Sequence, residues 1–449
     1  MSRLFINQQK TFQLHERSPI VFDMSDPGTG KTVSALEAYS KLVYPRKMLV
    51  DCTRTTMDPA WAADAREFYP ELRLVQLSAE TRMRSWLEDA DIYVINHDGV
   101  KWLAERLPEF KKRFKDGMLA NDESSYYKHR TSQRSKALMK LRPVFERVTN
   151  LTGTPDTNAI TDMWHQAYIL DYGRRLGKSF YAFRAATQDP VPTDKSGRFI
   201  KWVDKEGAEL AVAQRLRDIT IRHLFEECFD IPPDRVRPVK FTLPAKLRKA
   251  YDTMERQAVL LFENGKLVDA VHAGAVVNKL LQIASGAVYT SERDYELIDA
   301  SRYELVADLV EERPHSIVFF LWWHQRREIE RQLVQREISY RVIDGTITSK
   351  SQRDTSIEMF KAGALRVLLM HPMSAAHGLS LVRGTATIWP TPTYNLEWWL
   401  QGIKRIRRPG QTQPTETIIV TAKDTREERV AQAMAAKNKR QMSLLELFR

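Results

Sequence analysis

The stretch Ser25-Asp26-Pro27-Gly28-Thr29-Gly30-Lys31-Thr32 decides the fold of the first half of the chain. A short apolar run, Ile20-Val21-Phe22, precedes it, and a helix-like segment from Val33 to about Tyr44 follows it. Strand, glycine-bearing loop, Lys-Thr and helix is the order that a phosphate-binding loop needs, because backbone N–H groups and the helix N-terminus then face the phosphates. Lys31 supplies a positive charge there, and the Thr32 hydroxyl can ligate Mg²⁺.

One position departs from the usual pattern of such loops. The first glycine is replaced by Ser25, so the match rests on Gly28, Gly30, Lys31 and Thr32. The alternative is a plain glycine-rich turn, and the flanking strand and helix favour the phosphate loop over it. We therefore expect a nucleotide site whose loop contacts are Gly28, Thr29, Gly30, Lys31 and Thr32.

Length and composition indicate a globular protein of several domains. A chain of 449 residues exceeds one ordinary core, and two or three domains are expected. No apolar run approaches the roughly 18 residues of a membrane span, and the N-terminus lacks the apolar core of a signal peptide. We expect a cytoplasmic protein without membrane contact, in which Cys52 and Cys228 are buried reduced thiols.

The charge balance favours a polyanionic partner. Lys and Arg number 69 against 57 Asp and Glu, which gives a formal net charge of +12. Nucleic acid is the first candidate, because released counterions drive phosphate binding. Composition alone leaves a merely basic surface as an open alternative.

Strand-like apolar runs alternate with helical patterns in the first part of the chain. These runs are Ile20–Phe22, Lys47–Cys52, Arg73–Leu77, Asp91–Asn96, Gly117–Ala120 and Val148–Leu151. The alternation predicts a parallel sheet covered by helices on both faces, with ligands at the carboxyl ends of its strands.

A carboxylate pair follows the strand at Gly117–Ala120. Asp122 can hold Mg²⁺, and Glu123 can orient and deprotonate an attacking water. Such a pair is also a common surface feature, but its place behind a phosphate loop in the same sheet favours catalysis. Ahead of the loop, the amide of Gln8 is suited to reading the edge of an adenine ring, although a surface position is the common one for such a residue.

The alternation fades between about Asp156 and Ala300 and then resumes. Helical patterns cover 161–170, 210–222 and 243–262, an irregular stretch covers 189–197, and prolines near 231–238 indicate a linker. Later strands are expected at Ser316–Phe320, Tyr340–Ile343, Arg366–Met370, Thr387–Trp389 and Thr417–Val420. This half has no phosphate loop of its own, so it is interpreted as a partner domain.

The run Gln401–Gln411, QGIKRIRRPGQ, supplies what the partner domain contributes. Arg405 and Arg408 are three residues apart, which predicts that they share one face of a helix. An arginine inserted from a neighbouring domain stabilises the charge of phosphoryl transfer. A basic surface helix is the alternative.

The whole order of motifs resembles the superfamily II helicases and translocases of the Swi/Snf-type branch. DPGTGKT, DESS, LTGTP, AHGLSL and QGIKRIRRPGQ occur in the family's order, and the last matches the pattern Q-x-x-x-R-x-x-R-x-G-Q at every fixed position. Ser125 departs from the family, because many relatives have His there. The resemblance runs from about Leu4 to Val420, and the compact chain is similar to bacteriophage-encoded members.

The resemblance implies an α/β fold of two RecA-like (P-loop NTPase) parallel-sheet domains in tandem with helical insertions, and ATP and Mg²⁺ between them. It places domain 1 at 1–156, a helical elaboration and linker at 157–236, the helical start of the second half at 237–300, and domain 2 with a C-terminal helix at 301–449. It makes Gln8 the adenine contact, Thr32 and Asp122 the Mg²⁺ ligands, and Glu123 the catalytic base. From domain 2 it assigns Gln401 and Gly378 to the nucleotide, and Arg405 and Arg408 as arginine fingers.

The implied function is an ATP-driven motor that steps along DNA. The strand would lie against Thr53, Arg54, Asn96, His97 and the loop that holds Gly345. An ATP-gated clamp or nucleoprotein remodeller without net translocation is the alternative from another class. An RNA helicase is less favoured, because the closing motif matches the DNA-translocase branch.

The segment Gln441–Phe448 resembles the short peptides that dock on bacterial sliding clamps. The alternative is that Leu444, Leu445 and Phe448 pack a terminal helix against the second domain. Their spacing is ordinary core patterning, so packing is the interpretation that we favour.

Overall fold

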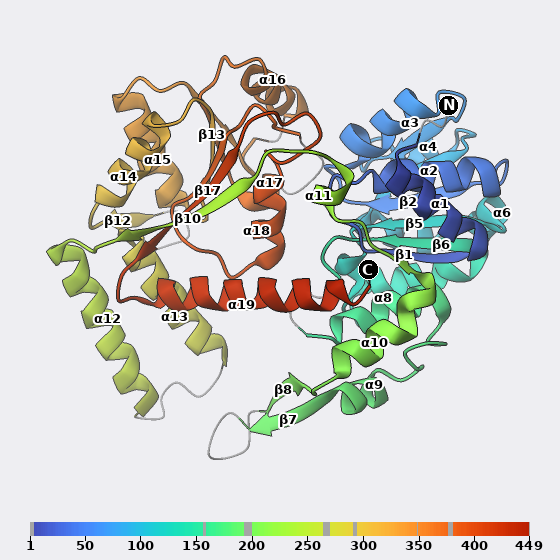
Figure 1. Cartoon of the computed structure of the whole chain (residues 1–449), viewed down its shortest axis with the longest axis horizontal. Helices are drawn as coiled ribbons and strands as arrows, with labels where there is room; N and C mark the ends of the chain where they lie inside the picture. The colour runs from blue at the N-terminus through green and yellow to red at the C-terminus, as the bar shows by residue number, and fades with distance from the viewer. Residues whose placement is uncertain are drawn as a thin grey trace. The chain divides into compact units, whose positions relative to one another are not determined.

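The computed structural model of the chain describes residues 4–155, 159–192, 200–263, 270–290, 294–347, 349–375 and 380–448. The chain forms two compact units (Figure 1). Unit 1 comprises Met1–Asp230 together with Lys437–Arg449, and unit 2 comprises Ile231–Ala436. Among the helices of the described ranges, none is long and apolar enough to span a membrane.

Unit 1 is built on a seven-stranded sheet in which every neighbouring pair is parallel, in the order β3-β4-β2-β5-β6-β1-β9. Its strands are β1 (Ile20–Asp23), β2 (Met48–Cys52), β3 (Leu74–Leu77), β4 (Ile92–Asn96), β5 (Gly117–Asp122), β6 (Phe145–Leu151) and β9 (Thr220–Ile221). The first six confirm the strands predicted from apolar runs. The short strand β9 falls inside a predicted helix, which ends earlier than expected, at Leu216 of α10 (Ala208–Leu216).

Two separate apolar cores cover the two faces of this sheet. Strand β2 shows why, since Leu49 belongs to one core whereas its neighbours Met48 and Val50 belong to the other. The surrounding helices are α1 (Ile6–Arg17), α2 (Lys31–Leu42), α3 (Ala63–Phe68), α4 (Arg82–Trp86), α5 (Val100–Ala104), α6 (Leu107–Phe114), α7 (Gln133–Leu141) and α8 (Asp162–Asp171).

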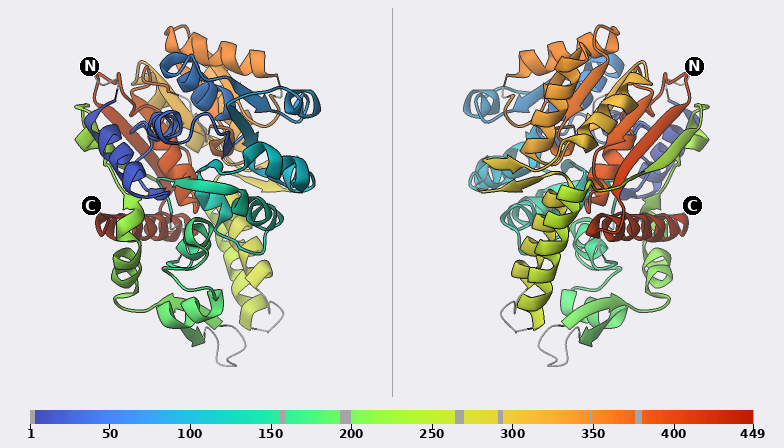
Figure 2. Two further views of the ribbon diagram at one scale, coloured as in Figure 1. Left: turned by 90° about the vertical axis from the view of Figure 1, so that its right-hand side faces the viewer. Right: turned by 90° about the vertical axis from the view of Figure 1, so that its left-hand side faces the viewer.

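A hairpin extends from unit 1 where the sequence suggests an irregular stretch. Strands β7 (Gln188–Pro192) and β8 (Ile200–Asp204) pair antiparallel as a separate two-stranded sheet. They lie between α9 (Phe180–Thr187) and α10, away from the main sheet of the unit in both views of Figure 2. The short helix α11 (Phe225–Cys228) ends near the junction with unit 2, and Cys228 is only partly buried, unlike Cys52.

Unit 2 contains a six-stranded, all-parallel sheet in the order β10-β17-β16-β13-β15-β14. Its strands are β10 (Asp234–Phe241), β13 (Ser316–Phe319), β14 (Tyr340–Ile343), β15 (Val367–Met370), β16 (Ala386–Trp389) and β17 (Thr415–Ala422). Strand β10 occupies the expected linker. Pro238 is tolerated in it because β10 is an edge strand and does not need every N–H for pairing.

Helices cover both faces of the second sheet as well. One core gathers Val318, Val367 and Ile388, and the other gathers their strand neighbours Ile317, Leu368 and Trp389. The helices are α12 (Ala245–Glu263), α13 (Ala270–Ala284), α14 (Ser301–Glu311), α15 (Trp323–Gln335), α16 (Lys350–Lys361), α17 (Pro372–Ala375) and α18 (Leu396–Ile403), beside a small hairpin of β11 (Ala287–Tyr289) and β12 (Tyr295–Leu297). Two parallel, helix-covered sheets are the tandem RecA-like arrangement.

The C-terminal helix α19 (Arg426–Glu446) begins in unit 2, and its last residues belong to unit 1. Leu444, Leu445 and Phe448 are buried in a core of unit 1, not against the second domain as expected. Gln441 is buried too, with 2% of its surface exposed. Four of the side chains that a sliding clamp would bind, those of Gln441, Leu444, Leu445 and Phe448, are therefore buried, and the docking hypothesis is not supported.

Two buried histidines should make unit 1 sensitive to acid. Burial lowers the pKa of His15 to about 3 and that of His165 to about 4, while an unfolded histidine titrates near 6.5. Below pH 6.5 the unfolded chain binds protons that the folded chain does not. The free energy of unfolding therefore decreases as the pH is lowered. Each histidine should contribute about 1.4 kcal/mol per pH unit until its folded pKa is reached.

Urea unfolding of wild type and His15→Gln between pH 7.5 and 4.5 measures this loss. Comparing the two proteins cancels Asp64, whose pKa burial raises to about 7 and which contributes with the opposite sign. His129→Gln gives the control for replacing an exposed histidine by glutamine. An equal slope in wild type and His15→Gln would contradict the prediction.

Candidate functional site

The phosphate-loop motif lies at the carboxyl end of β1 and leads into α2. Gly30 has a φ of +83°, a left-handed conformation that favours glycine, and it is the N-cap of α2. A Cβ at this position would lie 2.1 Å from Nε2 of Gln8, so a larger residue would also displace the Gln8 amide. Gln8 is buried, and its Nε2 donates to the carbonyl of Gly30 at 3.4 Å.

A second amide of α1 also holds this loop. Nδ2 of Asn7 donates to the carbonyl of Thr29 at 2.7 Å. From the sequence only Gln8 is predicted at the nucleotide site, because no local pattern indicates Asn7. Both tie the N-terminal helix to the loop.

Lys31 lies across the loop that precedes it. Its Nζ donates to the carbonyls of Ser25 at 2.6 Å and Asp26 at 3.1 Å. This conformation keeps the ammonium group inside the turn of the loop. The backbone N–H groups of this loop and of the first residues of α2 are the ones that the sequence assigns to phosphate binding at Gly28–Thr32.

Ser25 has a structural explanation. Its hydroxyl accepts a hydrogen bond from the backbone N–H of His223 at 3.0 Å, and its own N–H donates to Asp23 at 2.9 Å. The chain after β9 continues along the loop, where the backbone of His223 also accepts from the N–H of Asp26 at 3.0 Å. A glycine could not make the side-chain bond, so the departure from the usual motif fixes this returning segment.

The carboxylate pair lies at the carboxyl end of β5, two strands from β1 in the same sheet. Oδ2 of Asp122 accepts from Nε1 of Trp61 at 2.9 Å. Burial raises the pKa of Asp122, and the indole hydrogen bond and the Lys31 charge act against that rise. Glu123 has a φ of +54°, an uncommon conformation for a non-glycine residue.

The residues of this edge suit magnesium held together with a nucleotide. Within the described ranges, no group of three or more His, Cys, Asp or Glu side chains is arranged as a complete metal site. Mg²⁺ commonly takes one or two protein ligands and completes its shell with phosphate oxygens and water. Thr32 and Asp122 are the two oxygen-bearing side chains that the sequence assigns to such an ion.

The turn Thr152–Pro155 connects the loop, the carboxylates and the C-terminal segment. A Cβ on Gly153 would lie 2.8 Å from the ring of Pro27 in the phosphate loop. The carbonyl of Gly153 accepts from Nε2 of Gln441 at 3.2 Å. In the sequence this turn is part of the motif LTGTP.

A buried glutamine joins this turn to the residue after Glu123. Oγ of Ser124 donates to Oε1 of Gln166 at 2.9 Å, and Nε2 of Gln166 donates to the carbonyl of Pro155 at 2.7 Å. Gln166 lies on α8 and was not recognised in the sequence, because its helix is buried and apolar around it. Ser125, at the position where the family resemblance expects His, takes part in neither of these hydrogen bonds.

Strands β2 and β4 bring the predicted nucleic-acid contacts of unit 1 together. The two strands are neighbours, and Cys52 is paired in register with Asn96. Thr53 and Arg54 therefore lie beside Asn96 and His97 at one edge of the sheet. Arg54 is exposed and pairs with Glu80, whereas Thr53 is buried.

The side chain of His97 is less accessible than expected for a nucleic-acid contact. It is 4% exposed, its Nδ1 lies 2.9 Å from Oδ1 of Asp51, and its ring stacks on Tyr126 at 4.6 Å. Tyr127 also donates to Asp51. In this arrangement His97 supports the strand ends, and Tyr126 is the more exposed of the stacked pair.

The predicted residues of unit 2 in the described ranges lie on helix α18, on the turns that follow it, and after β14. Gln401 is on α18, where its Nε2 donates to Glu397 at 3.3 Å. The helix ends at Ile403, so Arg405 and Arg408 lie on the following turns and do not share a helical face. Arg405 is buried, Arg408 is partly exposed, and Nε of Arg408 donates to the carbonyl of Lys404.

Of the two glycines predicted at the site in unit 2, the structure describes Gly345 but not Gly378. Gly345 is exposed on the turn after β14, and a Cβ there would meet no atom within 4 Å. Gly378 lies outside the described residues, so its assignment stays a prediction.

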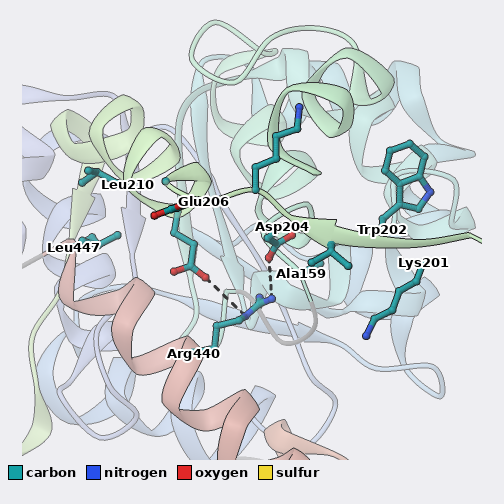
Figure 3. A pocket seen from close by; sticks show the side chains of 12 residues that line it. Ala159, Lys201, Trp202, Asp204, Glu206, Leu210, Arg440 and Leu447 are labelled. Carbon is teal, nitrogen blue, oxygen red and sulfur yellow. Dashed lines mark hydrogen bonds and ion pairs between the residues drawn. The ribbon is translucent and has the colours of Figure 1, made fainter. Parts of the chain in front are cut away.

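A cavity of about 600 Å³ lies elsewhere in unit 1, between β8, α10 and the end of α19 (Figure 3). Arg440 reaches into it and pairs with Asp204 at 2.9 Å and with Glu209 at 3.9 Å. The charged side chains that line the cavity neutralise one another, and none of the predicted site residues lines it. We interpret it as part of the docking surface of the C-terminal segment.

The fold and the loop geometry define a P-loop NTPase with two parallel-sheet units. A profile of the SNF2-related domain matches residues 12–285, and one of the helicase conserved C-terminal domain matches residues 301–410. The chain belongs to the SNF2-related family, the Swi/Snf-type branch of superfamily II helicase ATPases.

Relatives of different sizes share this core. Putative protein p41 of Acyrthosiphon pisum secondary endosymbiont phage 1 is 28% identical over 448 residues, which cover 94% of this chain and 93% of that protein. The uncharacterized ATP-dependent helicase MG018 of Mycoplasma genitalium is 21% identical over 91% of this chain and 39% of its own length. The human DNA annealing helicase and endonuclease ZRANB3 is 22% identical over 86% of this chain and 35% of its own length.

A solved structure of the Sulfolobus solfataricus SWI2/SNF2 ATPase core in complex with dsDNA is 20% identical. The match has a TM-score of 0.45 and covers 98% of this chain and 92% of that one. The chain thus spans nearly all of the phage protein but well under half of the bacterial and human helicases.

Proposed function

We propose that the protein is a DNA-stimulated ATPase that steps along the DNA backbone. The observation that carries this is the edge of the sheet in unit 1, where the phosphate loop, Asp122 and Glu123, and the Thr152–Pro155 turn follow the neighbouring strands β1, β5 and β6. Membership of the SNF2-related family supports the same function. The host cytoplasm is the expected compartment if the chain shares the phage origin of p41.

The proposed chemistry assigns one task to each group. Lys31 and the loop N–H groups bind the β- and γ-phosphates, and Thr32 and Asp122 hold Mg²⁺. When bound, Mg²⁺ neutralises charge on the transferred phosphoryl group. Glu123 orients the attacking water and takes its proton, and Gln8 lies beside the loop for the adenine ring.

The second unit completes the proposed site. Arg405 and Arg408 have the planar guanidinium groups that stabilise phosphoryl transfer, and they lie in the motif that matches the family at every fixed position. By resemblance, Gln401 and Gly378 are assigned to the part of unit 2 that responds to the bound nucleotide. Hydrolysis then depends on residues from both units.

DNA is proposed to lie against the carboxyl edges of the two sheets, at Thr53, Arg54 and Asn96 of unit 1 and at the Gly345 turn of unit 2. Such contacts address the backbone, so binding should be weakly selective for sequence and should fall steeply with salt. The net charge of +12 favours this kind of partner.

Removing the phosphate-binding ammonium tests the proposal. We expect DNA to raise the ATPase rate of wild type, and Lys31→Ala to lower it by at least 100-fold, because transition-state stabilisation of phosphoryl transfer is lost. The measurement is phosphate release with single-stranded DNA, duplex, forked DNA and RNA. Lys41→Ala, at the far end of the same helix, is the control. An ATPase that no nucleic acid stimulates would contradict the motor.

The clamp alternative makes a different prediction for movement. Only a translocase should displace a third DNA strand from a distant site at a rate set by ATP, whereas a clamp or remodeller should hydrolyse ATP without displacement. Stronger stimulation by RNA than by DNA would favour the RNA helicase. Triplex displacement together with the stimulation series separates these possibilities.

A further inference from the structure

An aromatic groove lies on unit 2, at the carboxyl end of β13. Leu321, Trp322 and Trp323 come one residue after the end of the strand, and Tyr289 of the β11–β12 hairpin lies beside them. The polar wall comes from α13 and is made of Asn278, Lys279 and Gln282. We call these side chains the tryptophan groove, and its volume is about 680 Å³.

The indoles of the groove are held in place without being buried. Trp322 stacks on His324 with the ring centroids 5.8 Å apart and an angle of 12° between the planes. His324 is fully buried, and its backbone N–H donates to the Tyr289 hydroxyl at 3.0 Å. Trp389 of the same unit is buried completely, whereas Trp322 and Trp323 remain partly exposed. Part of each indole therefore remains exposed at the groove.

Positive charge surrounds the second indole. The guanidinium groups of Arg326 and Arg327 each lie 4.9 Å from the centre of the Trp323 ring. Arg326 is neutralised by Asp344 and Glu330. Arg327 and Lys279 make no ion pair with any residue in the described ranges, so their charges are available at the groove.

Arg326 also connects the groove to a predicted DNA contact. Its Nη1 donates to Oδ2 of Asp344 at 2.6 Å, and Asp344 precedes Gly345 on the turn after β14. The same guanidinium therefore lies over Trp323 and holds the turn on which Gly345 is exposed. A backbone that crosses this turn would pass next to the groove.

We propose that the tryptophan groove binds an unpaired base of a DNA strand, an assignment that rests on the proposed DNA motor. Trp322 and Trp323 offer π-faces for stacking, and the amides of Asn278 and Gln282 can donate to and accept from a base edge. Lys279 and Arg327 match the charge of the adjoining phosphates. The protein then engages DNA with exposed bases more tightly than a blunt duplex.

Trp323→Ala tests the groove in the full-length protein. Loss of one base–aromatic stack should weaken binding of an unstructured single-stranded oligonucleotide about 5- to 150-fold. Blunt-duplex binding and duplex-stimulated ATP hydrolysis should fall much less, because Asp344 and Glu330 still hold Arg326 and the Gly345 turn. A 2-aminopurine base in the oligonucleotide should be quenched by wild type and not by Trp323→Ala.

Two further variants make the test decisive. Trp202→Ala is the matched control, because Trp202 is a partly exposed indole with an arginine, Arg184, 4.0 Å from its ring centre in unit 1. Lys279→Glu combined with Arg327→Glu changes only exposed side chains, so it tests the groove if removal of the indole prevents folding. This pair should also reduce single-strand affinity selectively.

The outcomes separate the groove from the motor. Selective loss of single-strand affinity in the groove variants, with Trp202→Ala like wild type, supports the assignment. Unchanged single-strand affinity and unchanged quenching in the groove variants, in a protein that DNA still stimulates, overturns the groove and leaves the motor standing. A wild-type protein that neither binds DNA nor responds to it overturns the motor first and the groove with it.

Discussion

Glu123→Gln is expected to retain ATP binding and to lose hydrolysis by about 10²- to 10⁴-fold, the range typical of a missing general base. The substitution keeps the size of the side chain and its ability to orient water, but an amide cannot accept the proton. The backbone at Glu123 already has a φ of +54°, which directs this residue away from the line of β5. Because Gln retains the same backbone branching, the loop conformation should be preserved.

Two measurements on the same preparation test this prediction. ATP binding is followed by a fluorescent nucleotide analogue, and turnover by phosphate release in the presence of saturating DNA. Glu146→Gln is a suitable control, because Glu146 is an exposed glutamate of unit 1 that pairs with Arg46. A fully active Glu123→Gln would remove the assignment of the base, while lost ATP binding would show that the substitution disturbs the loop.

The second large effect is expected at the arginines of unit 2. Arg408→Ala should lower kcat by about 10³- to 10⁵-fold, the contribution of an arginine finger, with little change in ATP affinity. Arg408→Lys should remain strongly impaired, because an ammonium group keeps the charge but lacks the two-pronged geometry. Arg405→Ala should have a similar effect on kcat, but Arg405 is buried, so its folding must be verified by thermal unfolding.

Arg407 provides an internal control for these arginine variants. It lies in the same turn, is also partly exposed, and is not one of the fixed positions of the motif. Arg407→Ala should therefore hydrolyse ATP at a rate near that of wild type. Equal losses at Arg407 and Arg408 would indicate that the turn as a whole, and not a specific guanidinium, sustains activity.

The sequence predicts the sheets well because their strands are short, apolar and buried on both faces. Met48–Cys52 and Val367–Met370 are examples, since every residue of each is buried in the structure. The missed strand β10 has the opposite character. It is charged, contains Pro238 and lies at an edge, so only its partner β17 specifies it.

Site residues could be predicted from the sequence where a motif coincides with the end of a strand. Residues that reach the site from distant segments of the chain could not be predicted. Lys31, Asp122 and Glu123 follow strands β1 and β5 in the order that the motifs require. Trp61 and Gln166 reach the same region from helical segments with no distinguishing pattern. The helix predicted across Arg405 and Arg408 ends early, at Ile403, where the chain enters turns.

The return of α19 to unit 1 has a consequence for synthesis. The core that contains Phe22 and Leu119 also contains Leu444, Leu445 and Phe448, which are translated after all of unit 2. Each of these late side chains contributes about 1.5–3 kcal/mol when fully buried. The nascent nucleotide-binding half therefore remains incomplete on the ribosome until the second half has emerged, and a truncated product would leave that core open to proteolysis.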